Sequence, residues 1–454
     1  MYSARAMDTD AVRNAVSSQM PTTLADLERL VRIPSIAFPG YDGVHVRRSA
    51  EATAEILEAA GLQGVRLIEM PDGVEHPAVF GELPAPDGAP TVLLYAHHDV
   101  QPEGPADQWD TPPFEPVIRD GRMFGRGTSD DKCGIVLHAA AIRAWDGRPP
   151  AGVKVLIEGE EEAGTEHLPF LIEEQRDLIA ADLAVVADAG NWRHGVPTLT
   201  TTLRGVVDCR VEVRVLEKAV HSGAYGGPIP DALTSLCRIL ATLHDERGNV
   251  AVAGLTSGRW DGVEYPEQEF WSEAGVVDGV EWIGEGSVAE RLWTKPAVSV
   301  LGIDAPTVRE ASNQLVPVAR AKVSLRIPPG QDAHEALERL MAHLRVNAPW
   351  GVQVGIEPGG EGEPFALATD GPMFEAARDA MRQAWGLDAV EMGSGGSIPL
   401  VPLLARTFPG LPILMLGASD ELAGAHSVNE SVAVDEIQRA TVAEALLLAG
   451  IASG

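Results

Sequence analysis

Three runs of apolar residues each end in a histidine or a carboxylate, and they constrain the fold more than any other feature of the chain. The runs are "TVLLYAHHDV" at residues 91–100, "GVKVLIEGE" at 152–160 and "ADLAVVADAG" at 181–190. Each run contains consecutive apolar residues, a pattern that is typical of strands covered on both faces. Because such strands alternate with helical segments, we predict a mixed α/β sheet flanked by helices.

Helix signals flank these strands, and a second pattern interrupts them. Residues 8–32 and 47–60 carry apolar side chains at helical spacing. Near residue 200, the stretch "TLTTTLRGVVDCRVEVRVLE" alternates polar and apolar residues, which is typical of one long strand in an antiparallel sheet with one face in water. We therefore predict that residues 1–199 and 365–454 form one domain around a smaller α+β domain at residues 200–364.

The charge balance and the cysteine count exclude several classes of protein. The 66 acidic side chains outnumber the 35 basic ones and give a net charge of −31, which argues against a nucleic-acid partner. Three cysteines make no disulfide framework and fit a reducing compartment. No apolar run approaches the roughly 18 residues of a membrane span, and the first residues lack the apolar segment of a secretory signal. We expect a cytoplasmic protein with neither a membrane nor a nucleic-acid partner.

Histidines and carboxylates follow several of the predicted strands, where α/β sheets place their active sites. His97 and Asp99 are two residues apart, so they share a face of an extended chain, and a carboxylate there can orient a ligating histidine. Asp130 follows a glycine-rich turn, where its simpler role is to cap the next helix. Taken alone, each such residue is most simply a polar group satisfied by local hydrogen bonds. The other members of the set are Glu161, Glu162, Asp188 and His426.

Together these residues indicate a site for two metal ions. Two histidines and three carboxylates offer nitrogen and oxygen ligands without a thiolate, which suits Zn²⁺ or Mn²⁺. A paired metal site activates a water and stabilises both oxygens of a hydrolytic transition state. Within "EGEEEAG", the spacing of the four glutamates indicates only that carboxylates gather at a strand end.

Seven motifs, in this order along the chain, resemble those of the zinc aminopeptidase-like family that includes carnosinases, carboxypeptidase G and aminoacylases. They are "YAHHDVQP", "GRGTSDDK", "EGEEEAGT", "ADAGNW", "HSGAYGG", "GGSIP" and "GAHSVNE". The dipeptidase branch has the most similar motifs to "DVQP", "HSGAYGG" and "GGSIP". The resemblance implies a zinc-exopeptidase-like mixed sheet and an inserted lid and dimerisation domain, through which the chain would form a homodimer.

The resemblance also implies a ligand set for two divalent ions, Zn²⁺ first, with Mn²⁺ and Co²⁺ as alternatives. His97 and Asp188 would ligate one ion, and Glu162 and His426 would ligate the other. Asp130 would bridge both ions. Three carboxylates offset most of the charge of two divalent ions, and a hydroxide offsets the rest.

The catalytic roles follow from the same resemblance. Glu161 would be the general base that takes a proton from the metal-bridging water and returns it to the leaving amine. Asp99 would orient His97. Of the remaining glutamates, we expect Glu158 to be a supporting hydrogen-bond acceptor and Glu160 to be the most replaceable.

Four further residues are assigned to the substrate by the resemblance. His221 would stabilise the oxyanion of the tetrahedral intermediate, often from the other subunit of a dimer. Arg326 would bind the C-terminal carboxylate of the substrate, for which a planar guanidinium is suited. Gly396 and Ser397, in a turn that begins at Gly395, would offer backbone N–H groups to the same end of the substrate.

The implied activity is hydrolysis of dipeptides or short peptides that have a free C-terminal carboxylate. The branch usually has an arginine shortly before "GGSIP", where this chain has Gly393 and Ser394, so one contact to the carboxylate is missing or moved. Two alternatives stay open: removal of the acyl group of N-acyl amino acids by the same metal site, and a metal-binding protein without catalysis.

Overall fold

The computed structural model describes residues 9–164 and 166–452. Residue 8 of the predicted first helix lies outside these ranges, as does the start of the stretch that lacks a secretory signal. The described residues form two compact units. Unit 1 takes the described residues of Met1–Thr200, Ala368–Met392 and Leu403–Gly454, and unit 2 takes Thr201–Leu367 and Gly393–Pro402.

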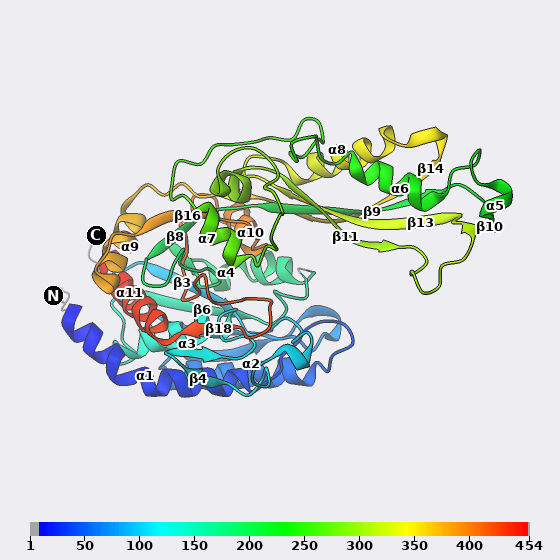
Figure 1. Ribbon diagram of the computed structural model, residues 1–454. Helices are drawn as coiled ribbons and strands as arrows, with labels where there is room; N and C mark the ends of the chain where they lie inside the picture. The colour runs from blue at the N-terminus through cyan, green and yellow to red at the C-terminus, as the bar shows by residue number, and fades with distance from the viewer. Residues whose placement is uncertain (1–8, 165, 453–454) are drawn as a thin grey trace. The chain divides into compact units, whose positions relative to one another are not determined.

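Unit 1 is built around a six-stranded sheet. Its strands are β1 (Gln63–Ile68), β2 (Ala78–Leu83), β3 (Thr91–His97), β6 (Gly152–Glu158), β7 (Leu183–Val186) and β17 (Ile413–Met415). They lie in the order β1-β2-β6-β3-β7-β17, and β3 and β6 are labelled in Figure 1. β2 pairs antiparallel with β1 and β6, whereas β3 is parallel to β6 and β7, and β7 is parallel to β17. The predicted mixed sheet is confirmed.

The parallel register of the central strands determines where their loops begin. His97 at the end of β3 lies opposite Glu158 at the end of β6, and Tyr95 lies opposite Val186 at the end of β7. The three strands therefore end at one edge of the sheet. The loops that leave this edge carry Asp99, Glu161, Glu162 and Asp188.

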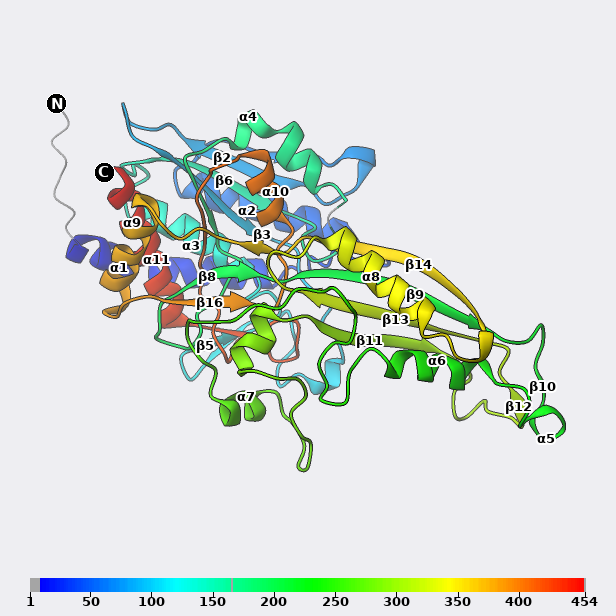
Figure 2. The same ribbon diagram turned by 90° about the horizontal axis from the view of Figure 1, so that it is seen from above.

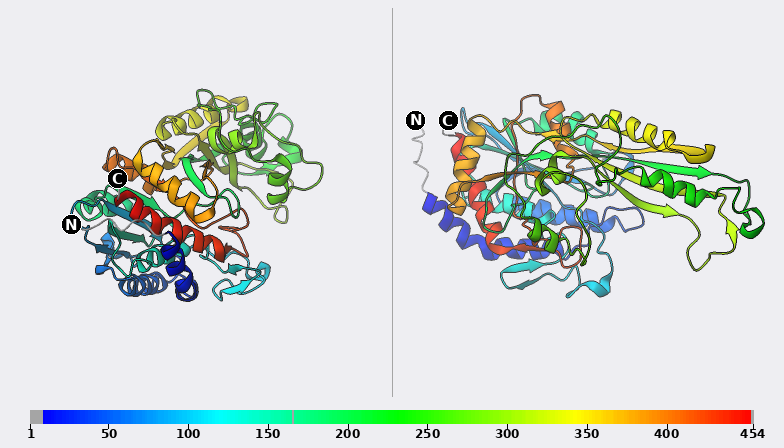
Figure 3. Two further views of the ribbon diagram at one scale, coloured as in Figure 1. Left: turned by 90° about the vertical axis from the view of Figure 1, so that its left-hand side faces the viewer. Right: turned by 45° about the horizontal axis from the view of Figure 1, so that its top comes forward.

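Helices pack against this sheet and share a hydrophobic core with it. Outside residues 201–367 the helices are α1 (Thr9–Val31), α2 (Val44–Ala59), α3 (Lys132–Arg143), α4 (Arg176–Ile179), α9 (Pro372–Trp385), α10 (Leu400–Thr407) and α11 (Val434–Ala452). The core joins the strands to α1, α2, α3, α9 and α11. α9 and α11 lie side by side, orange and red in Figure 3. Among the described residues, none of the helices combines the length and the hydropathy of a membrane span.

Unit 2 has an antiparallel sheet with helices on one face. The sheet contains β9 (Gly205–Arg214), β11 (Ala297–Asp304), β13 (Val318–Ile327) and β14 (Gln353–Gly362) in the order β11-β13-β9-β14. Alternate residues of β9 are buried in a core shared with α6 (Ala232–Ala241) and α8 (Ala333–Val346), which lie along the sheet (Figure 2). Further elements of this unit are β10 (Val220–His221), α5 (Ser222–Tyr225), α7 (Glu267–Glu273) and β12 (Gln314–Leu315).

The predicted long strand near residue 200 is two strands, so that prediction was wrong in part. β8 (Thr198–Leu203) lies between β15 (Phe365–Ala366) and β16 (Val390–Ser394), whereas β9 pairs with β13 and β14. Arg204 separates the two strands, and its N–H donates to the carbonyl of Ser394. A side chain on Gly205 would lie 2.4 Å from the carbonyl oxygen of Gly362, so the close approach at this break requires glycine. A further sheet has the order β18-β5-β4, with β4 (Val117–Arg119), β5 (Arg122–Phe124) and β18 (Ser431–Ala433).

Candidate metal centre

His97 is fixed by its own loop and faces a carboxylate. The residue is fully buried where β3 ends. Its Nδ1 lies 3.1 Å from the backbone carbonyl of Asp99, which can only accept, so this nitrogen carries the hydrogen. The other ring nitrogen, Nε2, lies 3.1 Å from Oδ1 of Asp130. Because Nδ1 is engaged, Nε2 is the nitrogen that is available to a metal.

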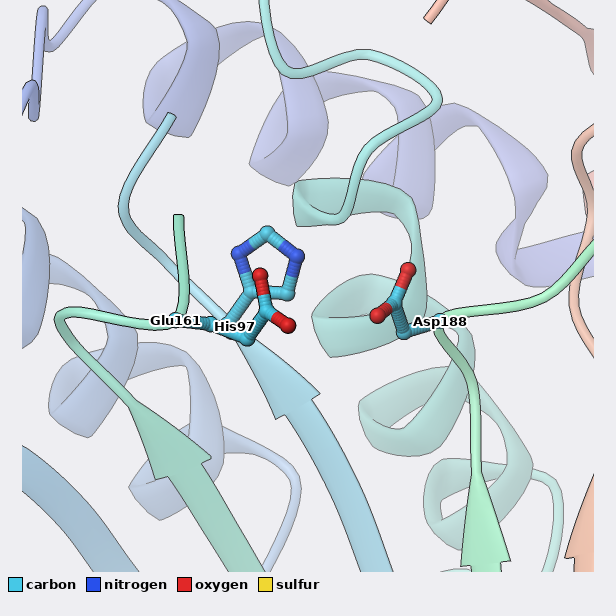
Figure 4. Close-up of side chains that lie close together, drawn as sticks. All are labelled: His97, Glu161 and Asp188. Carbon is cyan, nitrogen blue, oxygen red and sulfur yellow. The ribbon is translucent and has the colours of Figure 1, made fainter. Parts of the chain in front are cut away.

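Asp130 connects two groups of potential ligands. His97, Glu161 and Asp188 each offer an atom within 4.8 Å of the other two, and Figure 4 shows the two carboxylates beside the imidazole. Asp130, Glu162 and His426 form a second group with the same property. Nε2 of His426 lies 3.0 Å from Oδ2 of Asp130 and 3.2 Å from Oε2 of Glu162. One oxygen of Asp130 therefore faces each histidine.

The electrostatics of the two groups favour divalent cations. Burial raises the pKa of Glu161 to about 8, and it raises the pKa of Asp188 well above its usual value. Hydrogen bonds, first the one to Asp130, raise the pKa of His426 to about 10. The pKa of Asp130, which faces both histidines, is instead lowered by its hydrogen bonds to them, although burial opposes this shift. The two groups together hold four carboxylates and two histidines, so the carboxylates outnumber the cationic side chains. The nitrogen and oxygen donors, with no thiolate among them, fit two ions such as Zn²⁺ or Mn²⁺.

The Asp99 carboxylate binds the turn that follows β6. Its Oδ1 and Oδ2 accept the backbone N–H groups of Glu161 and Glu162 at 3.1 and 3.0 Å. Oδ1 is 3.5 Å from Nδ1 of His97, farther than the backbone carbonyl of Asp99. Asp99 thus contacts His97 chiefly through its main chain, while its carboxylate fixes the turn that carries Glu161 and Glu162. Sequence reasoning identified Asp99 but not this contact.

Glu430 holds the loop of Asp130, and sequence reasoning did not select it. Its side chain is fully buried. Oε2 accepts hydrogen bonds from Nη1 of Arg126 at 2.7 Å and from the N–H of Gly127 at 2.9 Å. Oε1 accepts the N–H groups of Ser129 and Asp130 at 2.9 and 3.0 Å. The only sequence signal was its place at the end of "GAHSVNE".

The same glutamate ends the loop of the second histidine. His426 lies four residues before Glu430 and has a φ of 62°, a left-handed conformation that costs a residue with a Cβ about 1–2 kcal/mol. Such a conformation persists only where the surroundings enforce it. Because Glu430 anchors one end of this loop and also binds the main chain of Asp130, it links the backbones of two ligands in the second group.

We expect Glu430→Gln to lower the free energy of unfolding of the metal-free protein by about 3–5 kcal/mol, because it leaves the buried guanidinium of Arg126 without its ionic partner. Glu391→Gln is the control, since Glu391 pairs with Arg378 at 2.6 Å near the surface, where such pairs contribute about 0–1 kcal/mol. Urea unfolding followed by far-UV circular dichroism measures both. Equal losses in the two variants would contradict the prediction.

The two remaining glutamates of "EGEEEAG" are both engaged. Oε2 of Glu158 accepts the hydroxyl of Tyr95 at 2.6 Å, which confirms the expected supporting acceptor. Burial raises the pKa of Glu158 to about 8. Glu160 is only 6% exposed and accepts the N–H and the Nδ1 of His167 at 3.1 and 2.9 Å. These contacts weigh against the expectation that Glu160 is the most replaceable of the four, which stays a prediction.

The other four predicted site residues belong to unit 2. His221 is exposed in β10, where its Nδ1 accepts the N–H of Gly223 at 3.0 Å. Arg326 is half-buried near the end of β13. Gly396 and Ser397 follow β16, and the N–H of Gly396 donates to Oγ of Ser394 at 3.1 Å.

His221 and Arg326 lie at opposite ends of the unit 2 sheet. His221 pairs with Gln314 of β12, which leads into the first residue of β13, Val318. Arg326 is eight residues further along the same strand, and that separation is about 27 Å at the rise of a β-strand. Figure 1 shows β10 at the end of the sheet. The two side chains of one chain therefore cannot contact the same dipeptide.

A third group of potential ligands has its charge balanced already. His194, Asp435 and Glu436 offer atoms within 4.8 Å of one another. Arg439 lies 2.9 Å from Asp435 and 2.5 Å from Glu436. The guanidinium of Arg439 and His194, whose pKa is raised first by its hydrogen bond to Asp435, together offset the two carboxylates and disfavour a further cation at this position.

Comparison with known proteins gives matches that include the motifs described above. A family model described as Peptidase family M20/M25/M40 matches residues 93–449. This chain belongs to that family. Among the relatives of this M20 peptidase is the cysteinylglycine-S-conjugate dipeptidase of Corynebacterium striatum, 36% identical over 419 residues, which are 91% of each chain. The human Beta-Ala-His dipeptidase is 27% identical over 391 residues, covering 80% of this chain and 76% of the relative.

The solved structures support the fold of this M20 peptidase. The crystal structure of human carnosine dipeptidase 1 matches with a TM-score of 0.84 at 22% identity, over 98% of this chain and 99% of that one. Likeness at this level of identity concerns the fold alone. With the family match and the relatives, it confirms the predicted metallopeptidase family, its dipeptidase branch and the zinc-exopeptidase-like sheet.

Proposed function

We propose that this M20 peptidase hydrolyses the peptide bond of dipeptides or short peptides that bear a free C-terminal carboxylate. The observation that carries the proposal is the position of Asp130, with oxygens 3.1 and 3.0 Å from Nε2 of His97 and of His426. This arrangement suits a carboxylate that is shared by two metal sites. The relatives are named for dipeptides, namely a cysteinylglycine S-conjugate and β-Ala-His.

The proposed metal ligands are all members of the two groups of side chains except Glu161. His97 and Asp188 would hold one divalent ion, Glu162 and His426 the other, and Asp130 both. Such a pair of ions, when bound, supplies a water of lowered pKa and polarises the scissile carbonyl. Zn²⁺ is the first choice, with Mn²⁺ and Co²⁺ as alternatives, because all three accept imidazole and carboxylate ligands.

Glu161 is the proposed general base. The turn that carries it is held by Asp99, so its carboxylate stays beside His97 and Asp188. Without metal, burial raises the pKa of Glu161 to about 8, and a carboxylate positioned in this way can act as a general base. Glu161 would take a proton from the attacking water and donate it to the leaving amine. Glu162, next in sequence, is engaged with His426 instead.

The test is a substrate panel on protein that has been stripped with a chelator and reloaded with Zn²⁺, Mn²⁺ or Co²⁺. The panel contains cysteinylglycine, β-Ala-His, N-acetyl amino acids and N-succinyl amino acids. We expect turnover of dipeptides by the reloaded protein and none by the stripped protein. Turnover of the acyl amino acids with none of the dipeptides would replace the proposal with the deacylase alternative. Metal binding with no turnover of any substrate would support a protein that does not catalyse.

A homodimer through the inserted domain is part of the proposal, and the position of His221 supports it. If His221 and Arg326 both contact one substrate, they must come from different chains, because β13 separates them within one chain. The outer strand β11 offers a surface for a second copy: Val300, Leu301 and Ile303 are 42%, 61% and 47% exposed. An edge strand with apolar side chains readily pairs with another chain.

We expect the wild-type protein to sediment as a dimer and Leu301→Lys to sediment as a monomer, because a charge on each copy opposes edge pairing. Mixing Glu161→Gln with His221→Ala should restore activity that neither variant has alone, since each chain would supply what the other lacks. Val346→Lys, at a position that is 81% exposed on α8, is the control and should stay dimeric. A monomeric wild-type protein, or a mixture without activity, would rule out the dimer proposal.

A further inference from the structure

Arg204 is a buried guanidinium that none of the predicted roles uses. The residue lies between β8 and β9 and is 8% exposed. Its Nε donates to the carbonyl of Gly395 at 3.3 Å, and its Nη1 lies 3.5 Å from the carbonyl of Arg291. Nη2 makes no hydrogen bond to a described residue. It lies so close to Gly395 that a Cβ added there would be 3.0 Å away.

Arg204 lies near Arg326 in unit 2. Arg204 directly precedes β9, and Arg326 is paired in register with Val206, the second residue of that strand. Burial and the charge of Arg326 lower the pKa of Arg204 to about 10. Burial also lowers the pKa of Arg326.

No carboxylate balances these two charges among the described residues. Neither Arg204 nor Arg326 forms an ion pair with a described acid. The next carboxylate on this face of β9, Asp208, is 3.5 Å from Nζ of Lys322. Buried charges are normally paired, and none of the 66 acidic side chains of the sequence is recorded as an ion-pair partner of Arg204 or Arg326 among the described residues. An anion from outside the chain would supply such a partner.

The loop after β16 completes this site within unit 2. Gly395 approaches Arg204 closely, and Gly396 and Ser397 follow it. A planar guanidinium presents parallel N–H groups that match the two oxygens of a carboxylate. We propose that Arg204 is a second guanidinium for the substrate's C-terminal carboxylate, acting beside Arg326 and the loop at Gly395. This inference rests on the proposed function and adds a residue that determines specificity for a free carboxylate.

The test compares a dipeptide with its C-terminal amide, using the dipeptide that wild-type protein turns over fastest. Arg204→Met should raise KM for the dipeptide about 10- to 100-fold, the range for a lost hydrogen bond to a charged group. The kcat/KM for the amide should stay within about twofold of wild type, because the amide has no charge for Arg204 to bind. Arg204→Lys keeps the charge without the planar fork, so its KM for the dipeptide should lie between those of wild type and Arg204→Met.

The control is Arg210→Met, since Arg210 is exposed on the same face of β9 and pairs with Glu357 at 3.1 Å. Arg210→Met should leave the kinetic constants for both the dipeptide and the amide unchanged. An equal loss of kcat/KM for the dipeptide and the amide in Arg204→Met would show that Arg204 only binds the carbonyls of two loops. An unchanged kcat/KM for both substrates would also overturn the proposal. If Arg204→Met does not fold, Arg204→Lys is used in its place. The ratio of its kcat/KM for the dipeptide to its kcat/KM for the amide then decides between the same outcomes.

Failure of the proposed function would be visible separately, because wild-type protein would then cleave no dipeptide. The anion site is in that case tested by calorimetric binding of N-acetylglycine and of N-acetylglycinamide. We expect wild-type protein to prefer the carboxylate and Arg204→Met to lose that preference. Equal binding of the two compounds by wild-type protein would overturn the site.

Discussion

Replacing Glu161 by glutamine should lower kcat by about 10²- to 10⁴-fold while both metal ions stay bound, because the substitution removes a proton acceptor and not a proposed ligand. Glutamine has nearly the same shape as glutamate. The Asp99 carboxylate holds this turn through the backbone N–H of Glu161, so the substitution does not disturb that contact. Plasma emission spectroscopy after gel filtration measures the metal content per chain. A steady-state assay on the dipeptide that is turned over fastest measures kcat.

Glu162→Gln is the matched comparison for this prediction. The two residues are adjacent, and Asp99 accepts the N–H of both, but only Glu162 lies against His426. We expect Glu162→Gln to lose metal together with activity, and Glu161→Gln to lose activity alone. Loss of one ion from Glu161→Gln would make Glu161 a ligand of the first group. Normal turnover by Glu161→Gln would refute its role as base.

Removing Asp130 should have the second large effect, the loss of both metal ions. Its two oxygens face two different histidines, so Asp130→Ala would remove a ligand from both proposed metal sites at once. His426→Ala removes a ligand from the second group only and should release one ion per chain. We expect the affinity for both ions to fall by more than about 100-fold in Asp130→Ala, since even residues that only support a ligand contribute 10- to 100-fold.

Equilibrium dialysis against a chelator of known affinity measures the number of ions that each variant retains. Circular dichroism of the metal-free variants serves as the control for folding. Retention of one ion by Asp130→Ala would mean that Asp130 belongs to a single metal site. In that case the proposal of a shared carboxylate, and with it the paired site, would fail.

The fold was predictable where burial leaves a simple pattern. Continuous apolar runs identify β3, β6 and β7, because both faces of these strands are covered. The break at Arg204 was not predictable, because alternation continues through it. The break depends on the carbonyls of Gly362 and Ser394, which are distant in sequence and are brought there by the fold.

Sequence reasoning located the residues of the candidate site but not the contacts that support them. It selected the six members of the two ligand groups from strand ends and motifs. It did not reveal that Asp99 binds the main chain of the turn at Glu161, or that Glu430 binds that of Asp130. Asp99 and Glu430 accept N–H groups of loops that are distant in sequence, so no local pattern marks these contacts, unlike those of a helix cap. Such supporting residues become visible only from coordinates.

The position of His426 has a consequence for how the protein is made on the ribosome. Five of the six grouped residues lie between His97 and Asp188, whereas His426 and the Glu430 that anchors its loop follow the whole of residues 201–367. Unit 2 has a hydrophobic core of its own, so it can fold while unit 1 still lacks β17 and α11. The second group is therefore assembled only after residue 426 has been translated, and a nascent chain stalled before that residue cannot complete it.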